Sequence, residues 1–206
     1  MNPEWLIAGL GNPGKQYAGT RHNVGWMVAA ALIEHFKCPV KTTSIYIYSQ
    51  INIAGTPSVV AMPTTFMNNS GEAILKLVNK LKIPTQKICI ILDEYNFLPG
   101  KIHLKDSGSD GGHNGLASVI EYLETHEFLR LRCGIGKNFG TGGMIEYVLS
   151  NFNESETEAR DKMIDDAVES VIHLVKFGKI KAMSDINSGK LFLPSTEKLE
   201  TDIISK

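Results

Sequence analysis

The sequence predicts an α/β fold, a single domain in which a mixed β-sheet is sandwiched between helices. Short apolar runs that are typical of strands alternate with longer segments whose apolar residues recur every three or four positions, as in amphipathic helices. The run Lys87–Leu92 ends in Ile-Cys-Ile-Ile-Leu, which is typical of a strand buried on both faces of a parallel sheet. One hairpin between residues 44 and 62 makes the expected sheet mixed rather than purely parallel.

The elements of the first half follow from apolar spacing and from the residues that stop them. A helix after the first glycine-rich loop has an apolar stripe that includes Trp26 and Ile33, and Pro39 ends it. Asn69 with Glu72 three residues later predicts a capping box for the next helix. The expected elements are strand 5–8, helix 23–36, strands 44–53 and 58–62, and a helix from 69 to the proline at 84.

The second half alternates strands and helices in the same way. A glycine-rich loop opens a helix whose apolar face begins at Leu116. Ser155 with Glu158 predicts a second capping box, here for a long helix that ends before Gly178. The expected elements are strands 87–92, 100–104 and 128–135, and helices 116–123 and 155–177.

The composition is that of an ordinary globular protein. The chain has 206 residues, of which 43% are hydrophobic and 21% charged, and its net charge is −1, so any surface for nucleic acid must be local. Its three cysteines are far apart in apolar surroundings and fit reduced core thiols. Without a membrane-spanning run or a basic leader, a cytoplasmic protein is expected. The domain is expected to span 1–186, and the polar residues 187–206 are expected to be a disordered tail.

The loop after the first strand resembles two nucleotide-binding motifs but departs from both. Gly9, Gly11 and Gly14 match the dinucleotide pattern G-x-G-x-x-G and nearly match a phosphate-binding loop. Both motifs need a helix that begins at the last glycine and faces phosphate with its N-terminus. A polar stretch with another glycine follows here, and Gln16 occupies the position of the metal-binding hydroxyl. A nucleotide-dependent enzyme is therefore kept only as a minor alternative.

Candidate catalytic residues gather where the expected elements begin or end. The chain has no G-x-S-x-G elbow, no H-E-x-x-H and no Cys/His cluster with metal spacing, so no metal site is expected. A histidine, a carboxylate and several amides suit attack of water on a carbonyl, with the histidine as base and the amides holding the carbonyl. A general base supplies about 10²–10⁴ in rate, so an activated ester is the expected substrate. The candidates are Asn12, His22, Asn68, Asp93, His113 and Asn114.

Five motifs occur in a recognisable order and spacing. They are Gly-Leu-Gly-Asn-Pro-Gly at 9–14 with Tyr17 and Thr20-Arg21-His22-Asn23, Pro63–Asn68 with Ser70-Gly71, Asp93-Glu94, Gly111–Gly115, and Arg130–Arg132 with Gly134-Ile135-Gly136. Together they resemble the bacterial peptidyl-tRNA hydrolase family over about residues 5–185. The resemblance implies a monomer without metal or cofactor, which cleaves the ester between a peptide and the 3′ end of tRNA and so recycles stalled peptidyl-tRNA.

The resemblance also implies a role for each candidate. His22 would be the base that activates water, Asp93 would keep it poised, and Asn12 would recognise the peptide backbone. His113 would lie nearby in a supporting role. The residues implied to contact substrate or tRNA are Tyr17, Phe66, Asn68 and Asn114 in the groove, and Lys105 and Arg132 at a tRNA phosphate.

Each candidate has a purely structural interpretation as well. By spacing alone, His22 is also typical of a cap or surface group, and Asp93 or Asn114 of a capping residue. Arg130 and Arg132 are equally typical of the solvated face of a strand. For the whole protein the main alternative is a non-catalytic RNA-binding module, because plant relatives of this family serve as RNA splicing factors. Release of peptide from peptidyl-tRNA separates the two functions.

Overall fold

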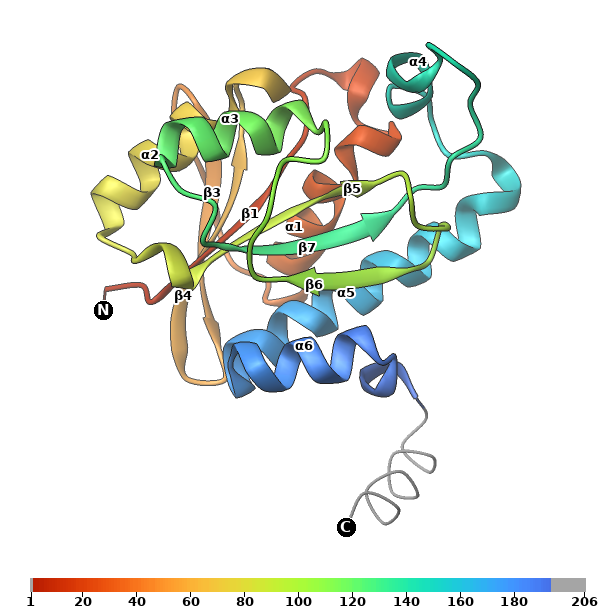
Figure 1. Cartoon of the computed structure of the whole chain (residues 1–206). Helices are drawn as coiled ribbons and strands as arrows, with labels where there is room; N and C mark the ends of the chain where they lie inside the picture. Colours follow the sequence, from red (N-terminus) through yellow and green to blue (C-terminus); the bar gives the residue numbers. More distant parts are fainter. Residues whose placement is uncertain (1, 194–206) are drawn as a thin grey trace.

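The structure is a computed structural model that describes residues 2–193. Within these residues, seven strands form one sheet in the order β2-β3-β4-β1-β5-β7-β6 (Figure 1). The strands are β1 Trp5–Gly9, β2 Val40–Thr42, β3 Tyr46–Ile53, β4 Thr56–Pro63, β5 Ile88–Glu94, β6 Ile102–Lys105 and β7 Leu129–Gly134. The α-helices are α1 Val24–His35, α2 Ser70–Leu81, α3 Asn114–Leu123, α4 Met144–Val148, α5 Thr157–Phe177 and α6 Lys179–Asn187. The 3₁₀ helices are η1 Lys15–Tyr17, η2 Arg21–Asn23, η3 Met67–Asn69, η4 Thr85–Lys87, η5 Glu154–Glu156 and η6 Lys190–Phe192.

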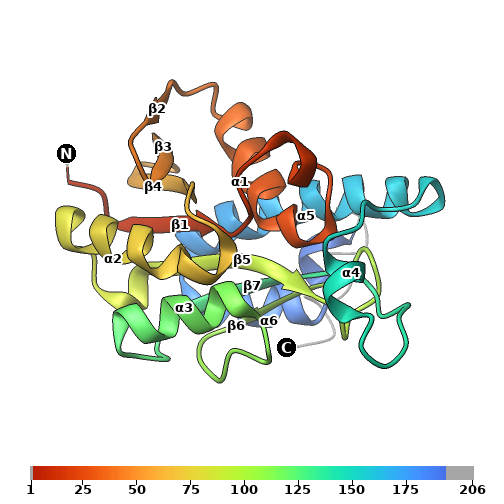
Figure 2. The same ribbon diagram turned by 90° about the horizontal axis from the view of Figure 1, so that it is seen from above.

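Helices cover both faces of the sheet, which confirms the predicted fold class. Successive side chains of β1 point to opposite faces, so Leu6 and Ala8 pack in the cluster with α2 and α3, while Trp5 and Ile7 pack in the cluster with α1 and α5. Figure 2 shows these two helical layers on either side of the sheet. Strands β4, β1, β5 and β7 are parallel, whereas β2, β3 and β6 pair antiparallel, so the sheet is mixed as predicted.

Parallel pairing brings the carboxyl ends of β1 and β5 to the same edge of the sheet. Gly9, the last residue of β1, is the partner of Ile91 in β5, two residues before Asp93. The loop that carries Asn12 therefore leaves the sheet beside Asp93. Ligands of open α/β sheets bind at this edge.

The glycines of the first loop serve helix packing rather than phosphate binding. A Cβ atom on Gly9 would lie 2.0 Å from the Gly25 carbonyl oxygen, and one on Gly25 would lie 2.4 Å from the Ile91 oxygen. These two glycines therefore allow α1 to approach β1 and β5 closely. Gly14 is followed by the three-residue η1, and α1 begins only at Val24, so the helix start that a nucleotide motif needs is not at the last glycine.

Replacing Gly25 by alanine is therefore expected to destabilise the fold. Its Cβ would press on backbone atoms, which cannot yield as a flexible side chain does, and overpacking of this kind costs about 1–3 kcal/mol or more. Urea unfolding followed by circular dichroism measures the change. Gly140→Ala is the control, because nothing lies within 4 Å of its added Cβ, and equal effects of the two substitutions would contradict the packing argument.

Both predicted capping boxes are wrong in detail. Asn69 Nδ2 donates to the Glu72 side chain at 2.7 Å, and the Asn69 side chain makes no capping hydrogen bond with the backbone of α2. The long helix is preceded by η5, so its reciprocal pair is Asn153 with Glu156 rather than Ser155 with Glu158. Several residues within one turn have capping chemistry, and the 3₁₀ turn before the helix decides which of them is placed to cap.

The predicted tail boundary at residue 187 is also wrong. Asn187 ends α6, and its side chain accepts from the Leu104 N–H at 2.8 Å and donates to the Leu104 carbonyl at 2.9 Å. These bonds satisfy the backbone of edge strand β6. Leu191, in η6, is 7% exposed and packs in the core. Residues 187–193 thus belong to the fold, and the expectation of disorder for 194–206 lies outside the described residues.

Candidate active site

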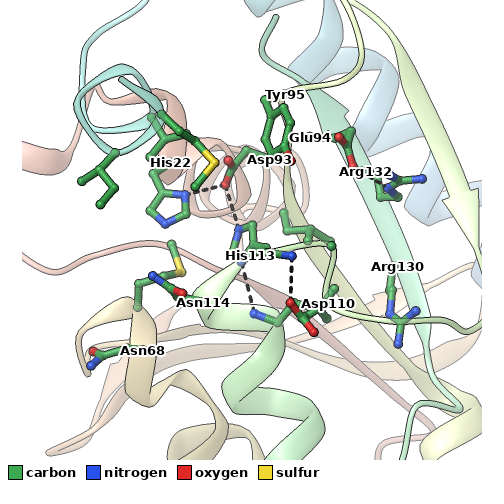
Figure 3. A pocket seen from close by; sticks show the side chains of 18 of the residues that line it. His22, Asn68, Asp93, Glu94, Tyr95, Asp110, His113, Asn114, Arg130 and Arg132 are labelled. Atoms are coloured by element: carbon green, nitrogen blue, oxygen red, sulfur yellow. Dashed lines mark hydrogen bonds and ion pairs between the residues drawn. The ribbon is translucent and has the colours of Figure 1, made fainter. Parts of the chain in front are cut away.

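A cavity of about 430 Å³ opens at the carboxyl edge of the sheet. Its walls come from η2, η3, the end of β5, the loop before α3, β7 and α4 (Figure 3). Tyr17, on η1, is the one predicted site residue that does not line it. The predicted residues that the structure brings together there are Asn12, His22, Phe66, Asn68, Asp93, Lys105, His113, Asn114 and Arg132.

His22, Asp93 and His113 form a hydrogen-bonded cluster in this cavity. His22 Nδ1 lies 2.8 Å from Asp93 Oδ1, and His113 Nε2 lies 2.9 Å from the same oxygen. His22 comes from η2, Asp93 from β5, and His113 from the residue before α3. The side chains are 12%, 3% and 9% exposed, respectively. Three segments that are distant in sequence therefore meet at one buried carboxylate oxygen.

A backbone amide decides where the protons of this cluster lie. The Leu116 N–H donates to His113 Nδ1 at 3.1 Å, so Nδ1 is an acceptor and His113 carries its proton on Nε2. An ionised carboxylate can only accept, so Asp93 receives a hydrogen bond from His113 Nε2–H and another from His22 Nδ1–H. His22 Nε2 then holds a free lone pair, and no residue between 2 and 193 bonds to it.

Asp93 is held in its charged form. Burial raises the pKa of Asp93, but its electrostatic interactions and hydrogen bonds with His113 and His22 lower it by more, so the net pKa lies well below its ordinary value. The carboxylate is therefore negative at neutral and mildly acidic pH. A fixed negative charge next to the imidazole stabilises the imidazolium that forms when His22 accepts a proton.

Among the described residues, the cluster of His22, Asp93 and His113 is the one group of His, Cys, Asp or Glu side chains placed closely enough to hold a metal ion. The ligand atoms of His22, Asp93 and His113 lie within 4.8 Å of one another. Histidine binds metal through an unprotonated nitrogen, whereas the nitrogens that face Asp93 here carry protons. The hydrogen bonds fit proton transfer better than metal binding, and the metal-free site stays a prediction.

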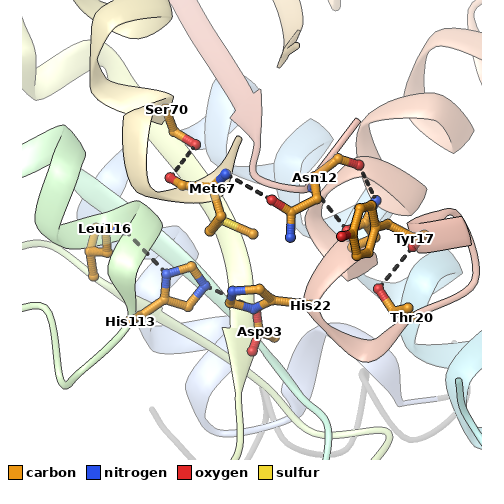
Figure 4. A network of polar contacts seen from close by, with 10 residues as sticks. Asn12, Tyr17, Thr20, His22, Met67, Ser70, Asp93, His113 and Leu116 are labelled. Carbon is orange, nitrogen blue, oxygen red and sulfur yellow. Dashed lines mark hydrogen bonds and ion pairs between the residues drawn. The ribbon is translucent and has the colours of Figure 1, made fainter. Parts of the chain in front are cut away.

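Asn12 presents an amide N–H group to the cavity. Its Oδ1 accepts a hydrogen bond from the Met67 N–H at 2.8 Å (Figure 4). Because a backbone N–H can only donate, this bond places the oxygen toward Met67 and the Nδ2 group away from it. Nδ2 donates to no other residue in the range 2–193 and is available for a substrate carbonyl oxygen. The exposed side chains of Asn68 and Asn114 line the same cavity.

The far side of the cavity carries cations on two paired strands. Figure 3 shows Arg130 and Arg132 there, away from His22. In the antiparallel register of β6 and β7, Lys105 lies opposite Arg130, and His103 lies opposite Arg132. Burial, together with Arg132 and two nearby lysines, lowers the pKa of His103, which favours a neutral ring. Lys105 and Arg130 remain a like-charge pair, which destabilises a sheet in the absence of an anion.

The two arginines differ in their partners. Arg132 pairs with Glu94, its Nε lying 3.0 Å from Oε2. Arg130 is 1% exposed, and its Nε and Nη1 have no hydrogen-bond partner among residues 2–193, while Nη2 donates to the His126 carbonyl. Burial and the charge of Arg132 lower the pKa of Arg130 by more than the nearby Asp106 and Asp110 raise it. The interpretation as a solvated strand face is wrong for Arg130, because the loop at Gly108 lies against its guanidinium.

An apolar surface completes the cavity. Four side chains around α4 line it, from Met144, Ile145, Val148 and Leu149. Ile145 is 66% exposed and Phe66 is 59% exposed, so part of this surface faces solvent. Exposed apolar side chains beside a few polar groups are typical of a ligand site. The sequence does not predict α4, because five helical residues are too few to show a periodic pattern.

The described cysteines offer no alternative nucleophile. Cys89 and Cys133 are buried, and burial raises the pKa of Cys89 to about 12 and also raises that of Cys133, while Cys38 is not among the residues that line the cavity. A histidine with an acid behind it and a free nitrogen, next to an amide donor, is the layout of a site that activates water. The fold and the site thus define an α/β protein of the hydrolase class.

Comparison with known proteins narrows this class to one family. The family model described as peptidyl-tRNA hydrolase matches residues 6–193. The chain is 41% identical over 186 residues to the peptidyl-tRNA hydrolase of Thermoanaerobacter sp. (strain X514), which covers 89% of this chain and 99% of that protein. It is 37% identical over 195 residues to peptidyl-tRNA hydrolase 2 of Corynebacterium jeikeium (strain K411), with 91% and 81% covered. The crystal structure of peptidyl-tRNA hydrolase from Acinetobacter baumannii matches with a TM-score of 0.85 at 35% identity, covering 91% and 96% of the two chains.

The chain belongs to the peptidyl-tRNA hydrolase family. The match to residue 193 includes α6 and η6, in agreement with their place in the core. No helix within residues 2–193 combines the length and the apolar character needed to cross a membrane.

Proposed function

We propose that this chain hydrolyses the ester bond between a peptide and the 3′ end of tRNA with His22 as its general base. His22 Nε2 takes a proton from water as the water oxygen attacks the ester carbonyl carbon. The imidazolium that forms is stabilised by Asp93 and returns the proton to the leaving ribose oxygen, which releases free tRNA and a peptide carboxylic acid. The observation that carries the proposal is the 2.8 Å contact of His22 Nδ1 with Asp93, which leaves Nε2 free.

The amides of the cavity suit the carbonyl groups of the substrate. Asn12 Nδ2 is a free donor, and a donor aimed at a carbonyl oxygen stabilises the negative charge that develops during attack. Asn12 would hold the peptide backbone, while Asn68, Asn114 and Phe66 would line the groove for the tRNA end and the substrate. Tyr17 does not line the cavity and would contact the substrate or the tRNA end from outside it. His113 would support Asp93 through its Nε2–H.

Release of peptide from an N-blocked aminoacyl-tRNA tests the function directly. The protein is expected to release the labelled acyl group without added nucleotide and to act poorly on the same aminoacyl-tRNA with a free amino group. Tight tRNA binding without release would instead indicate the non-catalytic RNA-binding module. The family match and the complete His22, Asp93 and Asn12 set do not favour that alternative.

The cations of β6 and β7 suit a tRNA phosphate, which positions a polynucleotide without reading its sequence. Lys105 is exposed and would make the direct contact, with Arg132 beside it. Arg132 already shares its charge with Glu94, whereas Arg130 has unpaired donors behind Lys105. Arg130 would therefore add positive potential to the phosphate site without reaching solvent itself.

Arg130→Met is expected to change stability and substrate binding in opposite directions. Removal of a buried cation with two unpaired nitrogens should raise the free energy of unfolding by about 1–3 kcal/mol. The same change should lower kcat/KM for peptidyl-tRNA and reduce its dependence on salt by less than the roughly one unit of log–log slope that the loss of a direct phosphate contact gives. Urea unfolding and kinetics at several salt concentrations measure the two effects.

Arg132→Met is the control for the stability measurement, because it removes the cation that pairs with the Glu94 carboxylate and should destabilise the fold. A fall in stability for Arg130→Met, with unchanged salt dependence, would mean that the unpaired nitrogens have no link to a phosphate.

We also propose that the protein is a monomer and acts in the cytoplasm. All groups that the mechanism uses come from one chain, so the site needs no second copy to be complete. The substrate is a tRNA ester of translation, which is found in the cytoplasm. Size-exclusion chromatography with light scattering tests the monomer, and a stable dimer of about twice 22.6 kDa would contradict it.

A further inference from the structure

Asn23 occupies a position where asparagine usually caps a helix, but its side chain is used differently. It is the N-cap residue of α1, yet its side chain makes no capping hydrogen bond. The Asn23 side chain is instead fully buried and bonds the backbone of Asn12 twice. The Asn12 N–H donates to Asn23 Oδ1 at 3.0 Å, and Asn23 Nδ2 donates to the Asn12 carbonyl at 2.9 Å.

This pair of bonds connects the catalytic segments. Asn23 follows His22 directly in η2, so its backbone moves with the proposed base. Asn12 is bound through both backbone polar groups, and its own side chain bonds the Met67 N–H of η3, the residue before Asn68. A continuous set of hydrogen bonds therefore runs from the His22 segment through Asn12 to the Asn68 segment.

We infer that Asn23 is a positioning residue, which fixes the distance between the Asn12 amide donor and the Nε2 atom of His22. The inference rests on the proposed function, since it assigns Asn12 and His22 to one reaction. The attacking water and the carbonyl that Asn12 holds must meet in one geometry, and a misplacement of about 1 Å can cost about 10²-fold in rate. Two bonds in parallel prevent the loop of Asn12 from rotating or sliding relative to η2.

The experiment compares Asn23→Asp and Asn23→Ala with the wild-type protein. Asp keeps the shape and the acceptor but loses the donor, and it sets an oxygen against the Asn12 carbonyl. Ala removes both bonds and introduces no charge. Both variants are expected to lower kcat for N-blocked aminoacyl-tRNA by about 10–10²-fold, with KM changed by no more than about threefold.

The chain supplies a matched control in Asn187→Asp. Asn187 makes the same two bonds with the backbone of Leu104, at 2.8 and 2.9 Å, but does not line the cavity. If Asn23 only stabilises the fold, both Asp variants should lower the thermal midpoint and leave kcat unchanged. The inference requires a fall in kcat for Asn23→Asp alone, measured at a temperature where each variant is folded.

A double-mutant cycle shows whether Asn23 acts through Asn12. On the Asn12→Ala background there is no amide donor to position, so Asn23→Ala should cost less than about threefold in kcat. Full additivity of the two substitutions, or a wild-type kcat for both Asn23 variants, would overturn the inference. Failure of the wild-type protein itself to release peptide would overturn the proposed function instead.

Discussion

His22→Ala is expected to lower the turnover of peptidyl-tRNA by at least about 10²-fold, and up to about 10⁴-fold, while tRNA binding is retained. The substitution removes the one nitrogen in the cluster that is free to accept a proton from water. It leaves the cations and the amides of the cavity in place, so affinity for tRNA should change little. Single-turnover kinetics with N-blocked aminoacyl-tRNA, together with filter binding of tRNA, separate the two quantities.

His35→Ala is the control for this measurement. His35 is an exposed residue at the end of α1, so its removal should leave turnover within about twofold of the wild-type value. Unchanged turnover in His22→Ala would remove the general base from the mechanism, whatever the effect on binding.

Asp93→Asn is expected to lower kcat by a similar factor, about 10²–10⁴-fold. The amide has no charge with which to stabilise the imidazolium of His22. It also offers N–H donors, and one of them can turn toward His22 Nδ1 and move the imidazole proton to Nε2, which blocks proton uptake. The dependence of kcat on pH, measured on the acid side of neutrality, tests whether His22 still acts as a base in this variant.

Asp185→Asn is a matched control, because Asp185 also bonds a histidine. His173 Nε2 lies 2.8 Å from Asp185 Oδ2, and Asp185 is not among the residues that line the cavity. Its loss should reduce stability without reducing turnover. Equal losses of turnover in Asp93→Asn and Asp185→Asn would show that destabilisation, and not chemistry, explains the first result.

Asp93 should also contribute to stability in a defined range of pH. Its pKa in the fold is well below the value of about 3.9 for an unfolded chain, so its contribution is present above about pH 4. The contribution is lost as the pH falls below that value toward the folded pKa. Thermal unfolding between pH 2.5 and about 6 should therefore show a shallower loss of stability for Asp93→Asn than for the wild-type protein.

Most elements of the fold were predictable because their causes are local. The continuous apolar run of β5 and the apolar spacing of α3 and α5 can each be recognised within a short stretch of sequence. The end of α5 at Gly178 follows from a backbone φ of 80° that favours glycine. The start of α5 and the place of Asn187 in the fold were not predictable, since Asn153 and Asn187 act through partners that neighbouring residues do not reveal.

The candidate site shows the same division. His22 and Asp93 could be found because polar residues at the ends of expected elements stand out against apolar patterns. The free donors of Arg130, the two backbone bonds of Asn23 and the proton position of His113 could not be found. Each depends on a group from another segment, such as the Leu116 N–H or the loop at Gly108.

The sequence by itself determined the α/β class, the ordinary globular composition and which side chains are candidates for catalysis, because composition and periodicity reside in the chain. Only the tertiary structure decided that two histidines share one oxygen of Asp93, and that Lys105 faces Arg130 across β6 and β7. The physical reason is that hydrogen-bond partners, burial and cross-strand neighbours are set by the register of the sheet, which joins segments that are far apart in sequence.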